Sequence, residues 1–367
     1  MMFVMAGGGT GGHVIPLIAV AEELRRRGHE VLFFGTAAGI EARLVPARGF
    51  ALEMIEIGGL KGVGLVRALR TLRQLPASTL AVLARLRRPG AAAVFSMGGY
   101  VAGPTVLAAV LARIPVVAME PNAVPGVTNR RMGRFVARTL VAFPETAAYF
   151  PEGRTELTGL PVRDEFFAIP PVRRGEALRL LITGGSRGSR TLNEAARQSW
   201  PLFRSWGTRV HITHQAGRDA CQTLRAEFAN AGLEGEVAAF IEDMPSAYAA
   251  ADLVIGRSGA GAVAELAAAG RPGVLVPFPF AADQHQMHNA LAFERAGAAR
   301  VVLDREMNGE KLFTRVRELA SEPNRLEHMG EAARGLARRG AARRAADILE
   351  EVAPKTLTAA RHSETIH

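Results

Sequence analysis

The chain has 367 residues, 22% of them charged and 48% hydrophobic, which argues against disorder and favours two domains. A single cysteine excludes an intrachain disulfide, and no uninterrupted run of about 18 apolar residues predicts a membrane span. The net charge of +10 is uneven, because residues 1–158 carry 18 Lys and Arg against 10 Asp and Glu. Lysine is rare and aromatic residues that could stack on bases are few, so we expect no nucleic-acid partner.

Short apolar runs alternate with amphipathic segments along the whole chain. In the first half they predict strands at 3–6, 30–34, 52–55, 93–95, 116–118 and 139–141, and helices near 13–27, 65–87, 101–112 and 126–134. In the second half they predict strands near 178–182, 209–213, 237–240, 253–255 and 273–276, and one helix over 330–351. This alternation indicates α/β architecture with parallel sheets covered on both faces.

Proline residues mark the predicted linker, 158–171. We therefore expect a first domain at 1–158, a second at 159–336, a helix at about 337–352 and a tail at 353–367. Two doubly wound domains joined in this way would leave an interdomain cleft, with ligands at the carboxyl ends of the strands.

A glycine-rich turn follows the first predicted strand of each half. The turns are Gly7–Gly12, which precedes His13, and Gly184–Arg190. Turns with few Cβ atoms let backbone N–H groups approach an anion at the positive end of a helix. The first turn also fits the dinucleotide-binding pattern, but the predicted second strand ends without an acidic residue, and the next acid is Glu41, inside a predicted helix. An NAD site is therefore disfavoured.

His13 directly follows the first turn, at the start of a predicted helix. We therefore interpret it as a candidate for catalysis or ligand contact rather than as an ordinary buried or surface histidine.

The segment Arg257–Glu265 contains only small residues between its two charged ends. Such a helix start lets a diphosphate approach the N–H groups, and Glu265 could accept two hydrogen bonds from a ribose diol. The alternative is an ordinary helix start with a solvated glutamate. Further on, His285, Gln286 and His288 lack a completing ligand for zinc, so we predict hydroxyl recognition there and no metal.

Six motifs in order make the chain similar to the MurG family. They are Gly8–His13, Gly98–Pro104, Glu120–Asn129, Gly159–Arg163, Gly184–Arg190 and Arg257–Glu265. This family comprises bacterial transferases that move N-acetylglucosamine (GlcNAc) from UDP-GlcNAc to undecaprenyl-pyrophosphoryl-MurNAc-pentapeptide (lipid I). The resemblance implies a GT-B fold of two Rossmann-like domains, with the donor held mainly by the second and the acceptor by the first. It also implies that the last helix, at about 337–352, packs back on the first domain.

The resemblance also assigns site residues by position. The donor-binding set is Thr10, Gly11, Gly12, Asn122, Arg163, Ser186, Ile241, Ala260, Gly261, Ala262, Val263, Ala264, Glu265 and Gln286; the acceptor-binding set is Gly98, Gly99, Tyr100 and Asn129. Two of the motifs depart from the family pattern. Met119 and Pro121 flank Glu120 where other residues are usual, and Arg187 replaces a usual glutamine.

The resemblance implies a single inverting displacement in which the MurNAc 4-hydroxyl attacks the anomeric carbon of GlcNAc. A base must take the hydroxyl proton, and His13 is the first candidate because imidazole titrates near working pH. Glu120 is the second candidate and could instead orient a sugar hydroxyl. Helix N-termini and Arg163 could stabilise the departing UDP, so we expect neither a metal nor another cofactor.

A lipid-linked acceptor requires a membrane surface, and the segment between Ile57 and Met119 contains no acidic residue. It carries Lys61, Arg67, Arg70, Arg73, Arg85, Arg87, Arg88 and Arg113, and Leu65, Val66, Leu69, Leu72 and Leu75 recur at helical spacing. This pattern predicts a helix lying on an anionic membrane, the alternative being a core helix with a solvated basic face. We expect a peripheral protein at the cytoplasmic face of the bacterial inner membrane.

Other functions stay open from sequence. One is another GT-B enzyme acting on a UDP-sugar, such as a lipid glycosyltransferase or a UDP-GlcNAc 2-epimerase. A second is a UDP-sugar-binding regulator without turnover.

Overall fold

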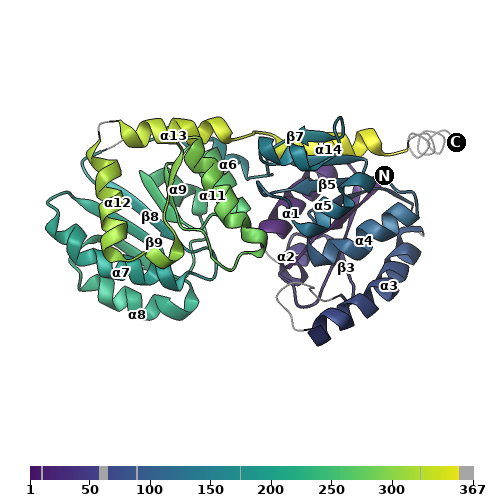
Figure 1. Ribbon diagram of the computed structural model, residues 1–367, viewed down its shortest axis with the longest axis horizontal. Coiled ribbons are helices and arrows are strands. Elements are labelled where there is room, and N and C mark those ends of the chain that lie inside the picture. The colour runs from purple at the N-terminus through teal and green to yellow at the C-terminus, as the bar shows by residue number, and fades with distance from the viewer. Residues whose placement is uncertain (10, 58–64, 88–89, 174, 323, 355–367) are drawn as a thin grey trace. The chain divides into compact units, whose positions relative to one another are not determined.

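The computed structural model describes residues 1–9, 11–57, 65–87, 90–173, 175–322 and 324–354, with the backbone alone at residues 65–73 and 100. The chain forms two compact units (Figure 1). Unit 1 comprises Met1–Pro161 and Gly340–His367, and unit 2 comprises Val162–Arg339. Each unit is an α/β structure built on its own parallel sheet.

Unit 1 contains a sheet in which all the paired strands are parallel. Its strands are β1 (Met2–Ala6), β2 (Glu30–Gly35), β3 (Ala51–Met54), β4 (Ala91–Ser96), β5 (Val116–Glu120), β6 (Arg138–Val141) and β7 (Thr155–Leu157). Within the described residues they run in the order β3-β2-β1-β4-β5-β6-β7. The central strands are apolar and buried on both faces, as Phe3, Val4 and Met5 in β1 illustrate.

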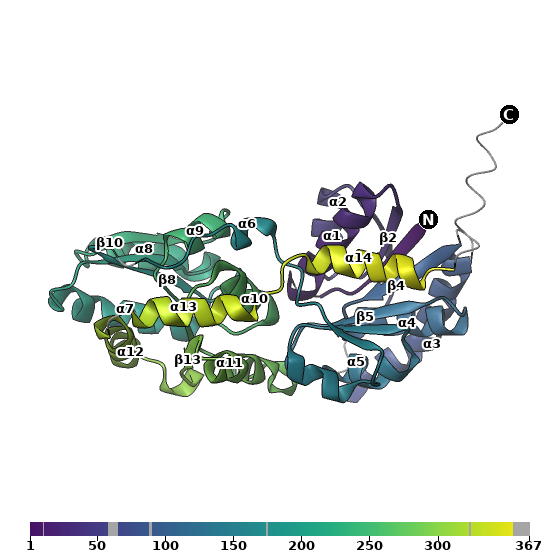
Figure 2. The same cartoon turned by 90° about the horizontal axis from the view of Figure 1, so that it is seen from above.

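Helices cover both faces of this sheet. They are α1 (Gly11–Arg26), α2 (Glu41–Ala47), α3 (Leu65–Arg87), α4 (Gly99–Leu111), α5 (Val127–Met132) and α14 (Ala341–Val352), with short 3₁₀ turns η1 (Gly133–Phe135) and η2 (Pro144–Tyr149). Helix α1 packs against α2 and α14, whereas α4 packs against α3 and α5 (Figure 2). The crossover helices therefore divide between the two faces, as in a doubly wound fold.

Unit 2 repeats the same plan. Its strands are β8 (Leu178–Thr183), β9 (Val210–Gln215), β10 (Glu234–Ala238), β11 (Leu253–Gly256), β12 (Gly273–Leu275) and β13 (Ala299–Val301), in the order β10-β9-β8-β11-β12-β13 across the described sheet. Its helices are α6 (Asp164–Phe167), α7 (Arg190–Ser205), α8 (Arg218–Ala229), α9 (Met244–Ala250), α10 (Ala260–Ala269), α11 (His285–Arg295), α12 (Gly309–Ser321) and α13 (Arg325–Leu336), with 3₁₀ turns η3 (Ala282–Gln284) and η4 (Asp304–Glu306).

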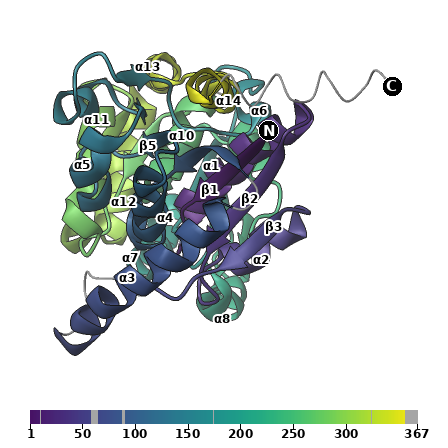
Figure 3. The ribbon, with the colours of Figure 1, turned by 90° about the vertical axis from the view of Figure 1, so that its right-hand side faces the viewer.

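The prediction of one continuous helix over 330–351 is wrong. Helix α13 ends at Leu336 and α14 begins at Ala341, because Gly340 adopts a left-handed conformation (φ +79°) that glycine tolerates without strain. The chain thereby returns to unit 1, where α14 packs on α1 (Figure 3). Several ion pairs hold it there, among them Arg27 with Asp347 and with Glu350, both at 2.7 Å, and Arg344 with Glu156 at 2.7 Å.

The strand order reverses once in each sheet, between β1 and β4 in unit 1 and between β8 and β11 in unit 2. Ligands of open α/β sheets bind at the carboxyl ends of the strands beside such a switch point. The turns that leave β1, β4, β8 and β11 are therefore where function is expected.

Candidate active site

In unit 1, His13 lies where the turns after β1 and β4 meet. It stands in the first turn of α1, directly after Gly11 and Gly12, and its Nδ1 lies 3.4 Å from the carbonyl oxygen of Gly8. A Cβ atom added to Gly99 would lie 3.5 Å from the same nitrogen. The structure thus brings together the glycine turn, the acceptor candidate Gly99 and the first candidate base. Thr10 lies outside the described residues.

Glu120, the second candidate base, ends β5 and is 1% exposed. Its Oε1 accepts hydrogen bonds from the backbone N–H and the side-chain amide of Asn122 at 3.0 and 3.1 Å. Its Oε2 accepts bonds from the N–H of Gly126 at 3.1 Å and the amide of Asn129 at 3.0 Å. Four donors therefore surround the carboxylate, which favours a role in shaping the loop 121–126 over proton transfer.

One candidate acceptor residue, Asn129, contacts this carboxylate, and another, Gly98, lies against Asn129. Asn129 is buried, and its amide also donates to the carbonyl of Met119 at 2.9 Å. Gly98 has a φ of +73°, and a Cβ there would lie 2.7 Å from Oδ1 of Asn129. Gly98 therefore has to be glycine both for its backbone conformation and for this contact. Tyr100 is the second residue of α4, and its side chain is not among those that the structure describes.

Glu41 stands too far along the chain to be the ribose-binding acid of a dinucleotide site, but it is 1% exposed and lies beneath the glycine turn. Its Oε2 accepts the N–H of Gly9 at 2.8 Å, and its Oε1 accepts both the N–H and the hydroxyl of Thr36, at 3.0 and 2.9 Å. The N–H of Gly9 is therefore already bound. Gly8, Gly9, Gly35 and Gly39 surround Glu41. The sequence shows these glycines, but it does not show that a carboxylate is buried among them.

In unit 2, the start of α10 supplies open backbone donors. Gly259 is the N-cap, and the residues that follow it are small and partly exposed: Ala260, Gly261, Ala262 and Ala264. Val263 alone in this turn faces the core. Because the first N–H groups of a helix have no intrahelical partner, this turn is suited to an anion.

Glu265 lies on the same helix and carries a perturbed carboxyl group. Burial raises its pKa to about 7, and the positive charge of Arg163 acts in the opposite direction. Arg163 stacks over the ring of Phe166 at 5.1 Å, and Phe166 contacts the buried Tyr248 edge to face at 5.3 Å. A partly desolvated carboxylate beside one arginine can accept hydrogen bonds from neutral hydroxyl groups.

The remaining donor candidates surround this helix start. The amide oxygen of Gln286 accepts the N–H of Phe278 at 3.0 Å, and its Nε2 would lie 3.9 Å from a Cβ on Gly259. The amide nitrogen is therefore directed towards the N-cap of α10. Ser186 is exposed in the turn after β8, and Ile241 follows β10.

Buried Gln215, at the end of β9, ties these last two loops together. Its Oε1 accepts the N–H of Ile241 at 2.8 Å, and its Nε2 donates to the carbonyl of Gly185 at 2.8 Å. Phe240, next to Ile241, is 48% exposed, whereas the sequence placed it as the last residue of the predicted strand 237–240; β10 ends at Ala238. An exposed ring at this edge is suited to stacking on a base.

Arg257 braces four loops of the same edge. Its guanidinium donates to Asp304 at 2.5 Å, to the hydroxyl of Ser189 at 2.7 Å and to the carbonyl of Val276 at 3.0 Å. Ser189 in turn caps α7 by accepting the N–H of Leu192 at 3.3 Å. Through these bonds from Nη1 and Nη2, Arg257 holds the loops in place.

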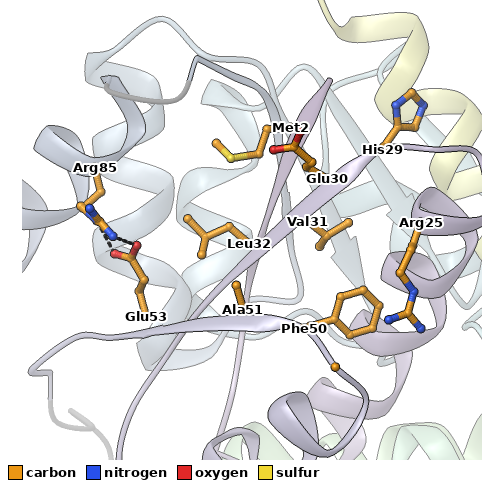
Figure 4. A pocket seen from close by; sticks show the side chains of 11 residues that line it. Met2, Arg25, His29, Glu30, Val31, Leu32, Phe50, Ala51, Glu53 and Arg85 are labelled. Atoms are coloured by element: carbon orange, nitrogen blue, oxygen red, sulfur yellow. Dashed lines mark hydrogen bonds and ion pairs between the residues drawn. The ribbon is translucent and has the colours of Figure 1, made fainter.

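A cavity of about 690 Å³ lies at the other end of the unit 1 sheet (Figure 4). It is lined by the first residues of the strands, including Met2, Glu30, Val31 and Ala51, and Glu53 pairs with Arg85 at its edge. This is the amino edge, away from the turns described above. Among the described residues no group of three or more His, Cys, Asp and Glu is arranged to hold a metal.

Two Rossmann-like units with glycine turns at their switch points are typical of the GT-B fold, and comparison with known proteins identifies the class as a GT-B glycosyltransferase. The model of the glycosyltransferase family 28 N-terminal domain matches residues 3–141, and that of the family 28 C-terminal domain matches residues 179–352. The chain therefore belongs to glycosyltransferase family 28.

Its relatives carry a more specific name. The chain is 64% identical over 351 residues to the UDP-N-acetylglucosamine--N-acetylmuramyl-(pentapeptide) pyrophosphoryl-undecaprenol N-acetylglucosamine transferase of Solibacter usitatus, covering 96% of each chain. It is 46% identical to the transferase of the same name from Halorhodospira halophila, covering 95% of this chain and 98% of that protein. The crystal structure of Acinetobacter baumannii MurG superposes with a TM-score of 0.80 at 33% identity, covering 95% and 99% of the two chains.

The burial of Glu120 generates a prediction about stability and pH. Burial raises the pKa of this carboxyl to about 7, and the hydrogen bonds from Asn129, Asn122 and Gly126 only partly offset the effect. The folded state keeps the proton up to about pH 7, whereas the unfolded chain releases it near its ordinary value of 4.5. The stability that this proton provides is complete below pH 4.5 and is lost as the pH rises to 7, by about 3 kcal/mol in total.

Glu120→Gln should therefore remove this part of the pH dependence, since an amide does not titrate. Hydrogen exchange of the β5 amides between pH 5 and pH 7.5 measures the stability of unit 1 alone. A measurement on the whole chain would not separate the two groups, because the pKa of Glu265 in unit 2 is also raised. Parallel pH profiles for the two proteins would contradict the prediction.

Proposed function

We propose that the protein transfers GlcNAc from UDP-GlcNAc to the MurNAc 4-hydroxyl of undecaprenyl-pyrophosphoryl-MurNAc-pentapeptide, a step of peptidoglycan synthesis. The observation that carries the proposal is 64% identity, over 96% of both chains, to a transferase named for this donor and acceptor. The hydroxyl oxygen forms a bond to the anomeric carbon, the bond to the diphosphate breaks, and UDP leaves with inversion.

Unit 2 would hold the donor. The N–H groups at the start of α10 would bind the diphosphate, Glu265 would accept the two ribose hydroxyls, and the amide of Gln286 would contact the sugar. Arg163 would add positive charge, and Phe240 with Ile241 would border the uracil. The supporting observations are the small, partly exposed residues at this helix start and the carboxylate one turn beyond them.

Unit 1 would hold the acceptor and supply the base. His13 is favoured over Glu120, because Glu120 is enclosed by four N–H donors while His13 stands at the edge of the glycine turn. The role left to Glu120 is to shape the loop that presents Asn122. Gly98 and Gly99 would let the acceptor approach the backbone closely.

The test of the function is transfer of labelled GlcNAc from UDP-GlcNAc to lipid I. We expect transfer by the wild-type protein, and His13→Ala should lower kcat about 10²- to 10⁴-fold, because a positioned base is lost, with UDP affinity nearly unchanged. Formation of the 2-epimer without transfer to lipid I would instead support the epimerase, and nucleotide binding without any turnover would support the regulator. Equal loss of kcat and UDP affinity in the variant would remove His13 from the base role.

Glu265 should make UDP binding depend on pH. Its pKa of about 7 leaves it largely protonated at pH 6 and ionised at pH 8, and the ribose hydroxyls donate to the ionised form. UDP affinity should therefore rise about tenfold over this range in the wild-type protein relative to Glu265→Gln. Calorimetry measures both, and the variant corrects for ionisation of the nucleotide itself. Parallel slopes would contradict the assignment.

We also infer that unit 1 rests on an anionic membrane. No helix within the described part of the chain has the length and hydropathy to span a bilayer. However, Leu80 on α3, Leu111 on α4 and Phe135 in η1 are 64%, 58% and 51% exposed. Helix α3 packs against α4, α4 against α5, and α5 against η1. Of the cations and apolar residues predicted to face the membrane, Lys61 and Arg88 lie outside the described residues. The side chains of Leu65, Val66, Arg67, Leu69, Arg70, Leu72 and Arg73 are likewise not described.

Vesicle co-sedimentation tests this surface. The protein should bind vesicles containing anionic phosphatidylglycerol, should release them as salt is raised, and should bind less after Leu80→Glu with Leu111→Glu. Met54→Glu is the matched control, because Met54 is 54% exposed but lies on β3. Vesicle binding that does not change with lipid charge, with salt or with the double substitution would overturn the membrane proposal.

A further inference from the structure

The carboxylate of Glu41 is enclosed by glycines. A Cβ atom on Gly8 or Gly39 would collide with its carboxylate oxygens, and one on Gly35 would lie 2.5 Å from its Cγ. Because α2 places this side chain beneath the turn and three N–H and O–H donors hold it, the carboxylate cannot move aside. The lack of side chains at these positions is therefore what admits a buried negative charge under the turn.

One peptide group connects this carboxylate to His13. The peptide between Gly8 and Gly9 donates its N–H to Oε2 of Glu41 at 2.8 Å, and its carbonyl oxygen lies 3.4 Å from Nδ1 of His13. A peptide whose N–H is bound by a charged acceptor becomes polarised, so its carbonyl is a stronger acceptor. The partner of one imidazole nitrogen decides which of the two nitrogens carries the proton.

We propose that Glu41 is a positioning residue that acts through the Gly8–Gly9 peptide to keep the proton of neutral His13 on Nδ1. Nε2 is then the nitrogen that accepts the proton of the attacking hydroxyl. The inference rests on the proposed function for its consequence in catalysis, but the tautomer itself is a property of the protein alone. Glu41 touches neither substrate in this arrangement.

The decisive variant is Glu41→Gln, with Glu41→Met as a second. An amide has no charge, and in either orientation it leaves one of the N–H groups of Gly9 and Thr36 without an acceptor; methionine offers no oxygen acceptor. Nitrogen NMR of protein labelled at histidine reads the tautomer directly, with the His13 signals assigned by their loss in His13→Gln. We expect a protonated Nδ1 in the wild-type protein and a shift towards protonated Nε2 in both variants.

The kinetic readout separates positioning from simple support. Loss of a supporting residue of this kind typically costs about 10- to 100-fold, so kcat should fall by that factor in Glu41→Gln. The KM for UDP-GlcNAc should change less than kcat, because most of the donor candidates, among them Ala260–Glu265, lie in unit 2 and away from Glu41. Val45→Ala is the matched control, since Val45 is fully buried on the same helix and does not contact the carboxylate network through a hydrogen bond. It should lower thermal stability while keeping the tautomer and kcat.

Three results would overturn the proposal: an unchanged tautomer in both Glu41 variants, a kcat that survives Glu41→Gln, or an equal loss of kcat in Val45→Ala at matched stability. If the wild-type protein shows no transfer, the proposed function fails, while the NMR comparison still decides the role of Glu41.

Discussion

The structure depends on which acceptors bind the backbone N–H groups at the carboxyl edges of the two sheets. Each is a strong donor that requires a partner. In unit 1 the chain provides partners itself, because Glu41 binds the turn after β1 and Glu120 binds the loop after β5. In unit 2 the first turn of α10 begins with small, partly exposed residues, and the carboxyl group of Glu265 stands beyond them. The turn after β1 is therefore ordered by a carboxylate of its own unit, whereas the start of α10 carries small, partly exposed residues.

The rigidity of the unit 2 edge comes from polar residues that do not themselves belong to the candidate donor set. Arg257 and Asp304 form a largely buried pair that also holds Ser189 and the carbonyl of Val276. Gln215 joins the turn after β8 to the loop after β10. A buried polar group that finds every partner fixes geometry more sharply than apolar packing does. This bracing keeps the helix start and the surrounding loops in register without occupying the donors that a ligand needs.

Periodicity and family resemblance together predicted the α/β fold, and the structure and comparisons confirm it. Most strands were located because buried parallel strands are continuous apolar runs, as in β1 and β11. Strands β7 and β13 were missed because Thr155–Leu157 and Ala299–Val301 are only three residues long and include charged side chains. The break between α13 and α14 was missed because Arg and Ala continue through it, and one left-handed glycine interrupts them. Glu41, Gln215 and Asp304 could not be identified, since their importance lies in burial and in contacts far along the sequence. The assignment of individual site residues stays a prediction.

The return of α14 to unit 1 affects how the polypeptide emerges from the ribosome. Helix α14, which covers part of α1, is made more than 300 residues after it. The surface of α1 that receives Glu350 and its neighbours stays uncovered throughout most of translation, whereas every strand and helix of unit 2 has been synthesised by residue 339. Nascent chains with such uncovered apolar surface are the ones that chaperones retain. Completion of unit 1 is therefore a late event in biosynthesis, although its sheet begins at the second residue.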